Sequence, residues 1–413
     1  MGIQRFLLFL FFFIVTNEVF CQLDSASNIA TISASERDLR DVFKHNSAAH
    51  KNAVENNEEP KPGKYLFSYV PALGYTLQTG FAGILSGNAA FYNGAAPDQK
   101  ISSISTSFTY SQYEQSIVPL IINIWTKNNK INFITDCRFI QYPSDIYGLG
   151  VRGLILAPDS NANTGYTINF SGLKFHQTVM FSVAKNVYAG VGYFYDQFWN
   201  IEAIDSLRRN VARVLTNKLG TNELASGPTL RFLYDSRTNQ INPDKGWYYN
   251  MVYRSSLKSL GSDANWSSLL VDMRTYTHFP ENSKNILAFW GLGWTTMSKK
   301  SPPYLLLPST GWDDQYNSGR GYIQGRYRGR DMFYIENEYR FGISRNGLLG
   351  GVVFANFQYF SSDLSKEFNN VKGGYGLGIR IKLNKYSGTN LAIDYGFGEK
   401  DSRGFFVNLG EVF

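Results

Sequence analysis

Apolar and polar residues alternate along most of the chain, from Lys64 to the last residue. Segments of roughly 10 to 16 residues follow this period of two, and tight polar turns or longer loops separate them. A period of two is typical of β-strands whose two faces meet different environments. The pattern predicts sixteen strands, at residues 64–76, 79–93, 100–113, 115–126, 130–142, 164–183, 186–200, 227–237, 246–258, 264–280, 284–298, 329–344, 346–360, 371–384, 389–398 and 404–413.

The lengths of the connections give a second, independent signal. The longest connections, 143–163, 201–226 and 299–328, all follow odd-numbered strands, whereas most connections after even-numbered strands are as short as 127–130. Outer-membrane barrels have short periplasmic turns and long extracellular loops. With a periplasmic amino terminus, the pattern therefore predicts an all-β fold, a 16-stranded antiparallel transmembrane β-barrel over residues 64–413.

The two faces of the predicted strands differ in chemistry. Leu377 and Ile379 share one face of their strand and Arg380 lies on the other, while Asp394 opposes Ile393 in the next strand. A barrel in lipid turns the apolar face outward and keeps the polar face for a hydrated lumen. A soluble sandwich, which buries apolar faces between two sheets, is the alternative. The charge on the second face counts against the sandwich.

The first 21 residues have a different composition. Arg5 precedes the ten apolar residues 6–15, and Cys21 follows a short polar stretch. This pattern predicts a secretory signal peptide that is cleaved near Cys21, because ten residues span only about 15 Å as a helix, too short for a membrane span. Acylation of Cys21 is an alternative, although Val19 and Phe20 stand where small residues are needed.

Residues 22–63 are polar and nearly free of aromatic residues. They predict a flexible periplasmic lead with a short helix around 36–43. Once the signal is removed, Cys137 is the single cysteine, which excludes an internal disulfide and a cysteine metal cluster. The formal charge of +7 is spread along the chain, so we expect no nucleic-acid partner.

Catalytic chemistry has little support in the sequence. The four histidines are His45, His50, His176 and His278, and neither strand histidine is accompanied by a serine motif of a hydrolase. No spacing typical of a metal site is present. We expect a protein that is not an enzyme and that has no cofactor and no metal. The alternating glycines of residues 373–380 indicate a smooth lumenal wall and not a phosphate loop.

Residues 318–341 contain five arginines and four glycines and run directly into a predicted strand. Arginines in lipid cost a few kcal/mol each near the midplane, so these must face water, headgroups or acids inside the barrel. Arg320, Gly321 and Tyr322, followed by the strand YIENEYRF, resemble the loop motif of the BamA/TamA-type outer-membrane assembly factor superfamily, also called the bacterial surface antigen barrels.

Three further stretches carry the same resemblance. Residues 234–249 look like the family's Asp-x-Arg then Pro-x-x-Gly turn, and residues 391–398 look like its penultimate strand. The last ten residues, GFFVNLGEVF, resemble its terminal strand signal, with Phe405, Leu409 and Phe413 on the apolar face. The resemblance covers the whole predicted barrel.

The resemblance implies that the extracellular loop at 299–328 folds inward and that Arg320 pairs with acids on the inner wall. The candidate acids are Glu338, Asp394 and Glu336. Asn356 departs from the family, which often has an aspartate there, so the resemblance implies a lock that uses other acids or is weaker. Another interpretation leaves the loop solvated, with its remaining arginines on lipopolysaccharide phosphates: Arg326, Arg328 and Arg330.

The resemblance also implies a function and a location, the bacterial outer membrane. Assembly factors insert or translocate outer-membrane proteins, and the seam between the first and last strands would be the lateral gate. Typical members carry periplasmic polypeptide-transport-associated domains, and residues 22–63 are too short for one, so we expect a protein that aids outer-membrane biogenesis alone or as an auxiliary subunit. The expected partners are outer-membrane lipids, lipopolysaccharide, other barrel-assembly subunits and client barrel proteins. A passive solute pore and a surface-exposed structural antigen are the alternatives.

Overall fold

The computed structural model describes residues 36–39, 65–76, 78–94, 99–149, 166–203, 220–312, 317–361, 371–385, 388–399 and 402–413. The predicted signal peptide and most of the predicted periplasmic lead, including most of the helix expected around 36–43, lie outside these residues. Among the residues described, no helix has the length and apolar character needed to cross a membrane.

The strands form one antiparallel sheet. Their bounds are β1 Leu66–Thr76, β2 Gly80–Phe91, β3 Ser102–Ser111, β4 Ser116–Trp125, β5 Ile131–Gln141, β6 Ser144–Ile146, β7 Tyr166–Ala184, β8 Val187–Ala203, β9 Glu223–Asp235, β10 Gly246–Ser256, β11 Trp266–His278, β12 Ile286–Thr296, β13 Asp331–Gly342, β14 Leu349–Phe360, β15 Lys372–Asn384, β16 Thr389–Phe397 and β17 Arg403–Leu409. Short 3₁₀ turns lie at η1 Lys127–Asn129, η2 Lys258–Leu260 and η3 Tyr304–Leu306.

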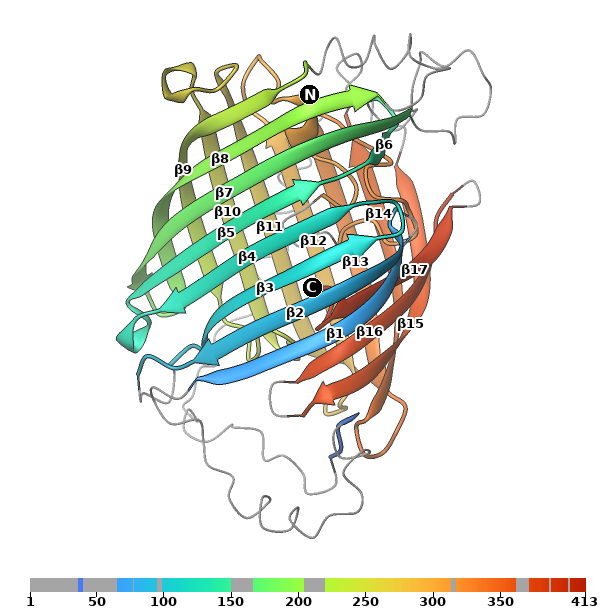
Figure 1. Cartoon of the computed structure of the whole chain (residues 1–413). Coiled ribbons are helices and arrows are strands. Elements are labelled where there is room, and N and C mark those ends of the chain that lie inside the picture. Colours follow the sequence, from blue (N-terminus) through green and yellow to red (C-terminus); the bar gives the residue numbers. More distant parts are fainter. Residues whose placement is uncertain are drawn as a thin grey trace, which may run out of the picture. The chain divides into compact units, whose positions relative to one another are not determined.

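Each long strand pairs with the next long strand along the chain, and this confirms the sixteen predicted strands. The three-residue β6 is additional; it pairs with β7 just beyond the end of β5, which pairs with the same strand. A sandwich would need two sheets. The single sheet instead curls into a barrel of tilted strands (Figure 1), in which β1 and β17 lie in contact.

The outward face is apolar and exposed. Tyr375, Leu377 and Phe357 are 63%, 58% and 54% exposed, whereas Asn356 and Asp394 on the opposite face are fully buried. Lipid is the solvent that suits a continuous belt of this kind. The alternation read from the sequence therefore assigns the faces of these strands correctly.

The inner face is more apolar than the sequence predicts. An aromatic cluster lies on its inner side, formed by β11 to β14 and by the long loop after β12. Its largest members are fully buried: Trp290, Tyr322, Tyr334 and Phe360. The polar inner face expected from strands β14 to β16 does not extend to β12 and β13, where Trp290 and Tyr334 pack edge to face with ring centroids 5.0 Å apart.

The last strand corrects one prediction. β17 ends at Leu409, and Gly410, with a φ of 96°, turns the chain into the lumen (Figure 1). Phe405 faces outward as predicted, but Phe413 is only 3% exposed and packs against Trp290 inside the barrel. After the turn Glu411 accepts hydrogen bonds from Arg380 and Asn390 of the inner wall, which stabilise the inward course of the chain.

A small part of the predicted lead is described. The main-chain N–H of Arg37 donates to Asn346 O at 2.9 Å, and the carboxylate of Asp38 accepts the main-chain N–H of Lys385 at 3.2 Å. These contacts attach residues 36–39 to the turns after β13 and β15, the ends at which the connections are short.

Candidate functional site

The connection between β12 and β13, residues 297–330, is here named the arginine loop. Its two limbs hydrogen-bond to each other: Ser309 forms a bridge with Arg328, and the main-chain N–H of Thr310 donates to Tyr327 O at 2.9 Å. The described part of the loop is therefore a hydrogen-bonded hairpin, and its tip lies between the two limbs.

Two glycines form the tip. Gly319 and Gly321 have φ values of 79° and 104°, which favour glycine, and the main-chain N–H of Tyr322 donates back to Gly319 O at 3.0 Å. A Cβ on Gly321 would lie 2.7 Å from the main-chain oxygen of Phe397 in β16. The bend and the close approach to the wall both require glycine.

The guanidinium of Arg320 lies among the three acids proposed from the resemblance. Its Nη1 donates to Asp394 Oδ2 at 2.5 Å, and its Nη2 donates to Glu336 and Glu338. The side chain is 1% exposed, and its Cζ lies 3.6 Å from the ring centroid of Phe354. Burial alone would lower the pKa of Arg320, but the three carboxylates raise it well above its usual value. The charge is therefore permanent.

Asn356 has a role that the sequence did not suggest. Its Nδ2 donates to the main-chain oxygen of Arg320 at 2.9 Å, and the residue is fully buried. An aspartate has no N–H and could not make this bond. The amide therefore holds the backbone of the loop tip while the three acids hold its side chain.

The alternating glycines of β15 make room for the loop tip. A Cβ on Gly374 would lie 2.8 Å from Arg320 O, and one on Gly378 would lie 1.8 Å from Asp394 Oδ1. The smooth wall predicted from residues 373–380 is therefore the surface on which the loop and the acid of β16 rest.

Further charges extend the cluster toward the end of the chain. Arg340 Nε donates to Glu338 Oε2 at 2.7 Å, and Arg380 Nη1 donates to Asp394 Oδ1 at 2.5 Å. Arg380 Nε also donates to Glu411 Oε2 at 2.7 Å. We name the whole buried set the lumenal lock: Arg320, Arg340, Arg380, Glu336, Glu338, Asp394 and Glu411.

Tyr322 anchors the other side of the tip. Its hydroxyl donates to Gly373 O at 2.5 Å and accepts the main-chain N–H of Glu399 at 3.0 Å, while Ser402 Oγ donates to Gly321 O at 2.7 Å. Burial raises the pKa of Tyr322, so the hydroxyl stays protonated and can keep donating. All three residues of the loop motif are thus engaged with the inner wall.

The first limb of the arginine loop contacts the opposite wall. Glu223, at the start of β9, accepts the main-chain N–H groups of Tyr304 and Leu305 at 3.2 and 3.4 Å. Leu305 packs into a cluster from β5, β7 and β8, and Arg328 Nη1 donates to Tyr304 O at 2.7 Å. The loop therefore spans the lumen from one wall to the other.

The interpretation of the other loop arginines as solvated phosphate binders is wrong for Arg328, which is 3% exposed. Arg326 lies over the ring of Tyr147, 4.6 Å from its centroid, and Arg330 donates to Ser298 O at 2.6 Å. Contacts within the loops occupy these side chains.

The comparison with protein families shows to which family the chain belongs. Residues 101–413 match the family model described as the Omp85 superfamily domain. The chain belongs to the Omp85 superfamily. It is accordingly an outer-membrane β-barrel protein.

Solved Omp85 barrels have the same fold. BamA from Haemophilus ducreyi lacking POTRA domains 1–3 superposes with a TM-score of 0.54 at 14% identity, over 88% of this chain and 78% of that one. CdiB from Acinetobacter baumannii superposes with a TM-score of 0.53 at 14% identity, over 84% of this chain and 60% of that one. No curated protein matches the chain in sequence at a significant level.

Sequence reasoning missed a repeated feature of this Omp85 barrel. An acid and an arginine two positions apart share one face of a strand or its end, and they pair there. Arg274 binds Asp272 through Nε at 2.9 Å and Nη2 at 2.6 Å, and Arg237 binds Asp235 in the same bidentate way. The pairs are Asp136–Arg138, Asp235–Arg237, Asp272–Arg274 and Glu338–Arg340. The spacing of an acid and an arginine two positions apart in the sequence could have indicated these ion pairs.

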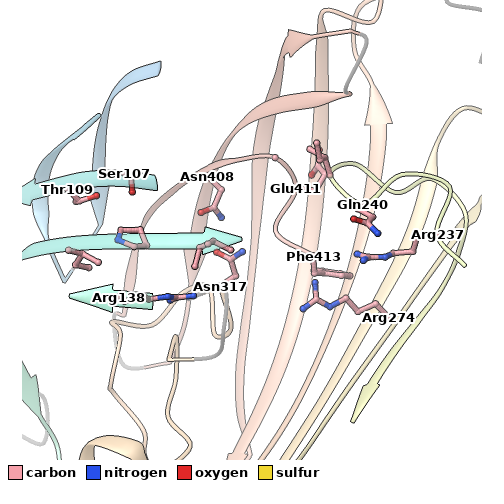
Figure 2. Close-up of a pocket in the computed structure, with 15 residues that line it drawn as sticks. Ser107, Thr109, Arg138, Arg237, Gln240, Arg274, Asn317, Asn408, Glu411 and Phe413 are labelled. Carbon is pink, nitrogen blue, oxygen red and sulfur yellow. The ribbon is translucent and has the colours of Figure 1, made fainter. Parts of the chain in front are cut away.

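A cavity of about 520 Å³ remains in the lumen of the Omp85 barrel beside the lock (Figure 2). Arg138, Arg237 and Arg274 line it together with Glu411 and Phe413. The cavity leaves space next to the inward-turned end of the chain.

The two strand histidines have structural partners. His176 Nε2 lies 2.9 Å from Asp196 Oδ2, which Arg254 Nη1 also contacts at 2.6 Å, and His278 Nε2 lies 3.6 Å from Asp244 Oδ2. Within the described part of the chain, no group of His, Cys, Asp and Glu could hold a metal ion.

Proposed function

We propose that this barrel acts in outer-membrane protein assembly, by insertion or translocation, alone or as an auxiliary subunit. The observation that carries the proposal is the lumenal lock, in which Arg320 joins an extracellular loop to acids of β13 and β16. Membership of the Omp85 superfamily supports the same class of function.

In this proposal the lock stiffens one part of the barrel and leaves the seam between β1 and β17 free to move. The arginine loop braces β13 to β16 and, through Glu223, reaches β9 on the other side. By contrast β17 has only seven residues, and it lies in contact with β1. We infer that the lateral gate is this seam, because breaking it costs the fewest hydrogen bonds.

The end of the chain connects the seam to the lock. Glu411 lies one residue beyond the turn at Gly410 and binds Arg380, which binds Asp394, the partner of Arg320. In this proposal, movement of β17 at the gate pulls on Glu411, and the buried ion pairs resist it. The lock would set how far the seam opens.

We further propose that capture of client chains depends on partner subunits in the periplasm. Affinity purification of the full chain from native membranes tests this point. Stable association with other barrel-assembly subunits is the expected result, and a chain recovered without them contradicts an auxiliary role.

A complementation experiment in the native host tests the function. The chain is depleted and replaced by the Arg320→Ala variant or by Arg330→Ala, a matched control in the same loop whose described hydrogen bonds go to main-chain oxygens. Depletion should lower the amounts of other barrel proteins, and only the control should restore them. An unchanged outer-membrane protein profile on depletion overturns the proposal.

A passive solute pore is the second candidate, and the cavity of about 520 Å³ with its three arginines favours it. Planar-bilayer recording separates the two functions. If the loop closes the lumen, breaking the lock with Arg320→Ala should raise the conductance. A steady open pore with the same conductance in wild type and Arg320→Ala would instead favour solute passage.

A further inference from the structure

The segment that follows β17, residues 410–413, occupies a site made almost entirely by other elements. The main-chain N–H groups of Gly410 and Glu411 donate to Asn390 O at 2.8 Å and Ile241 O at 3.3 Å. Asn317 Nδ2, in the arginine loop, donates to Val412 O at 2.7 Å. These main-chain groups of the segment thus form hydrogen bonds with other elements, as the main-chain groups of a bound peptide do.

The side chains of the segment are held by preformed groups. Arg380 Nε and Asn390 Nδ2 donate to the two oxygens of Glu411 at 2.7 and 2.6 Å. Phe413 lies in an aromatic pocket, with its ring centroid 5.3 Å from that of Trp290 and 6.2 Å from that of Tyr276.

Arg340 closes the pocket. It donates through Nη2 to Phe413 O at 2.9 Å, and its Cζ lies 5.3 Å from the centroid of the Phe413 ring. The same guanidinium belongs to the lumenal lock through Glu338.

Two features make the occupant exchangeable. Gly410, in a left-handed conformation, joins the segment to a strand of only seven residues at the seam, so rotation about this one residue can carry the segment away once its side-chain contacts break. The cavity of about 520 Å³ borders Gly410, Glu411 and Phe413, and Figure 2 shows Glu411 and Phe413 among its lining side chains. A displaced or incoming segment therefore has space beside the pocket.

We propose that this lumenal pocket is a peptide-binding site for flexible segments with an acidic residue two positions before an aromatic residue, and that residues 410–413 are its internal competitor. Arg380 and Asn390 bind the carboxylate, and the Trp290–Tyr276 pocket binds the aromatic ring. Asn317 binds the main-chain oxygen of the residue between them, and Arg340 binds the main-chain oxygen of the aromatic residue. The occupant must be a flexible segment, because the pocket lies inside the barrel and a folded partner cannot enter. The proposal is independent of the assembly function.

The internal segment controls access. A tethered ligand competes at an effective concentration in the millimolar range, so a free peptide binds well only when the segment is absent or weakened. The full chain therefore binds added peptide poorly, and a chain lacking residues 411–413 binds it well.

Fluorescence anisotropy with a labelled peptide of residues 408–413, Asn-Leu-Gly-Glu-Val-Phe, tests the proposal on the purified barrel. The variant lacking residues 411–413, with its barrel verified by heat-dependent gel migration, should bind the peptide saturably and about tenfold or more tightly than the full chain. Peptides with Glu→Gln or Phe→Ala should each lose about tenfold or more in affinity.

A full-length variant tests the proposal even if the truncated chain does not fold. Glu411→Gln combined with Phe413→Ala weakens the internal segment without removing it, and peptide binding should rise above that of the wild type. Equal binding by all three proteins, indistinguishable affinities of the three peptides, or no binding to the folded truncated barrel would each overturn the proposal.

Discussion

Arg320 illustrates why one side chain can hold a loop across a barrel. A planar guanidinium directs several N–H groups outward in fixed directions, and here two of its nitrogens reach three carboxylates on two strands. The carboxylates are as buried as the arginine. Each charge therefore depends on the others for the solvation that water would otherwise give.

Removal of this guanidinium should destabilise the barrel strongly. Arg320→Ala leaves Glu336, Glu338 and Asp394 buried with less compensation, and breaking a buried pair in this way costs about 3 to 5 kcal/mol. The midpoint of thermal unfolding, followed by heat-dependent gel migration, measures the loss. Adding Glu336→Gln to Arg320→Ala should recover part of it, because one unpaired charge disappears.

Arg330→Ala serves as the control and should change the midpoint little. A double variant less stable than Arg320→Ala would contradict the ion-pair explanation.

Glycines at the contact between loop and wall offer a second test. A Cβ on Gly396 in β16 would lie 2.6 Å from the main-chain nitrogen of Gly321, so Gly396→Ala should push the loop tip from its seat. A Cβ on Gly293 in β12 would meet no atom within 4 Å, and Gly293→Ala is the matched control. Proteolysis of the arginine loop on intact cells should accelerate for the first variant only. Equal cleavage would show that the seat is not formed by this contact.

Strand length differs sharply around the barrel and should determine local stability. β7 and β8 have 19 and 17 residues and pair along most of their lengths, whereas β17 has seven and lies at the seam. Edge strands open locally at low free energy. Amide hydrogen exchange should therefore be faster in β1 and β17 than in β7 and β8. Equal protection of all four strands would argue against a weak seam.

The sequence predicts what depends on local pattern and misses what depends on distant partners. Alternation places all sixteen long strands, and it places Glu336, Glu338 and Asp394 on the inner face, because facing follows from position parity alone. The inward turn at Gly410 was missed, since it is stabilised by Arg380, 31 positions from Glu411 in the sequence. The same holds for the aromatic cluster around Trp290.

The lumen as a whole has two electrostatic regions. The lock combines three arginines with four acids, whereas the wall opposite carries basic residues in excess over aspartates. Arg231 illustrates the difference. Its Nε donates to the amide oxygen of Asn250 at 2.7 Å, whereas the arginines of the lock donate to carboxylates.

Ion selectivity measures this asymmetry. Current through barrels that combine Arg320→Ala with Glu336→Gln and Glu338→Gln, which leaves two arginines and two acids in the lock, should prefer chloride to potassium, because basic lumens attract anions. The reversal potential in a potassium chloride gradient gives the preference. Arg231→Gln in the same background should reduce it, and cation-selective current would contradict the assignment of a basic wall.

The separation of Arg320 and Asp394 by 74 positions has a consequence for how the molecule is made. When the chain folds, this ion pair can form only once β16 has joined the sheet that contains β13, so until then Arg320 lacks its partner Asp394. Only a chain with its last strands in register can draw that cation inside. Burial of the arginine loop therefore depends on completion of the barrel. A barrel without its last strands in register should leave the loop accessible to protease, and a complete barrel should protect it.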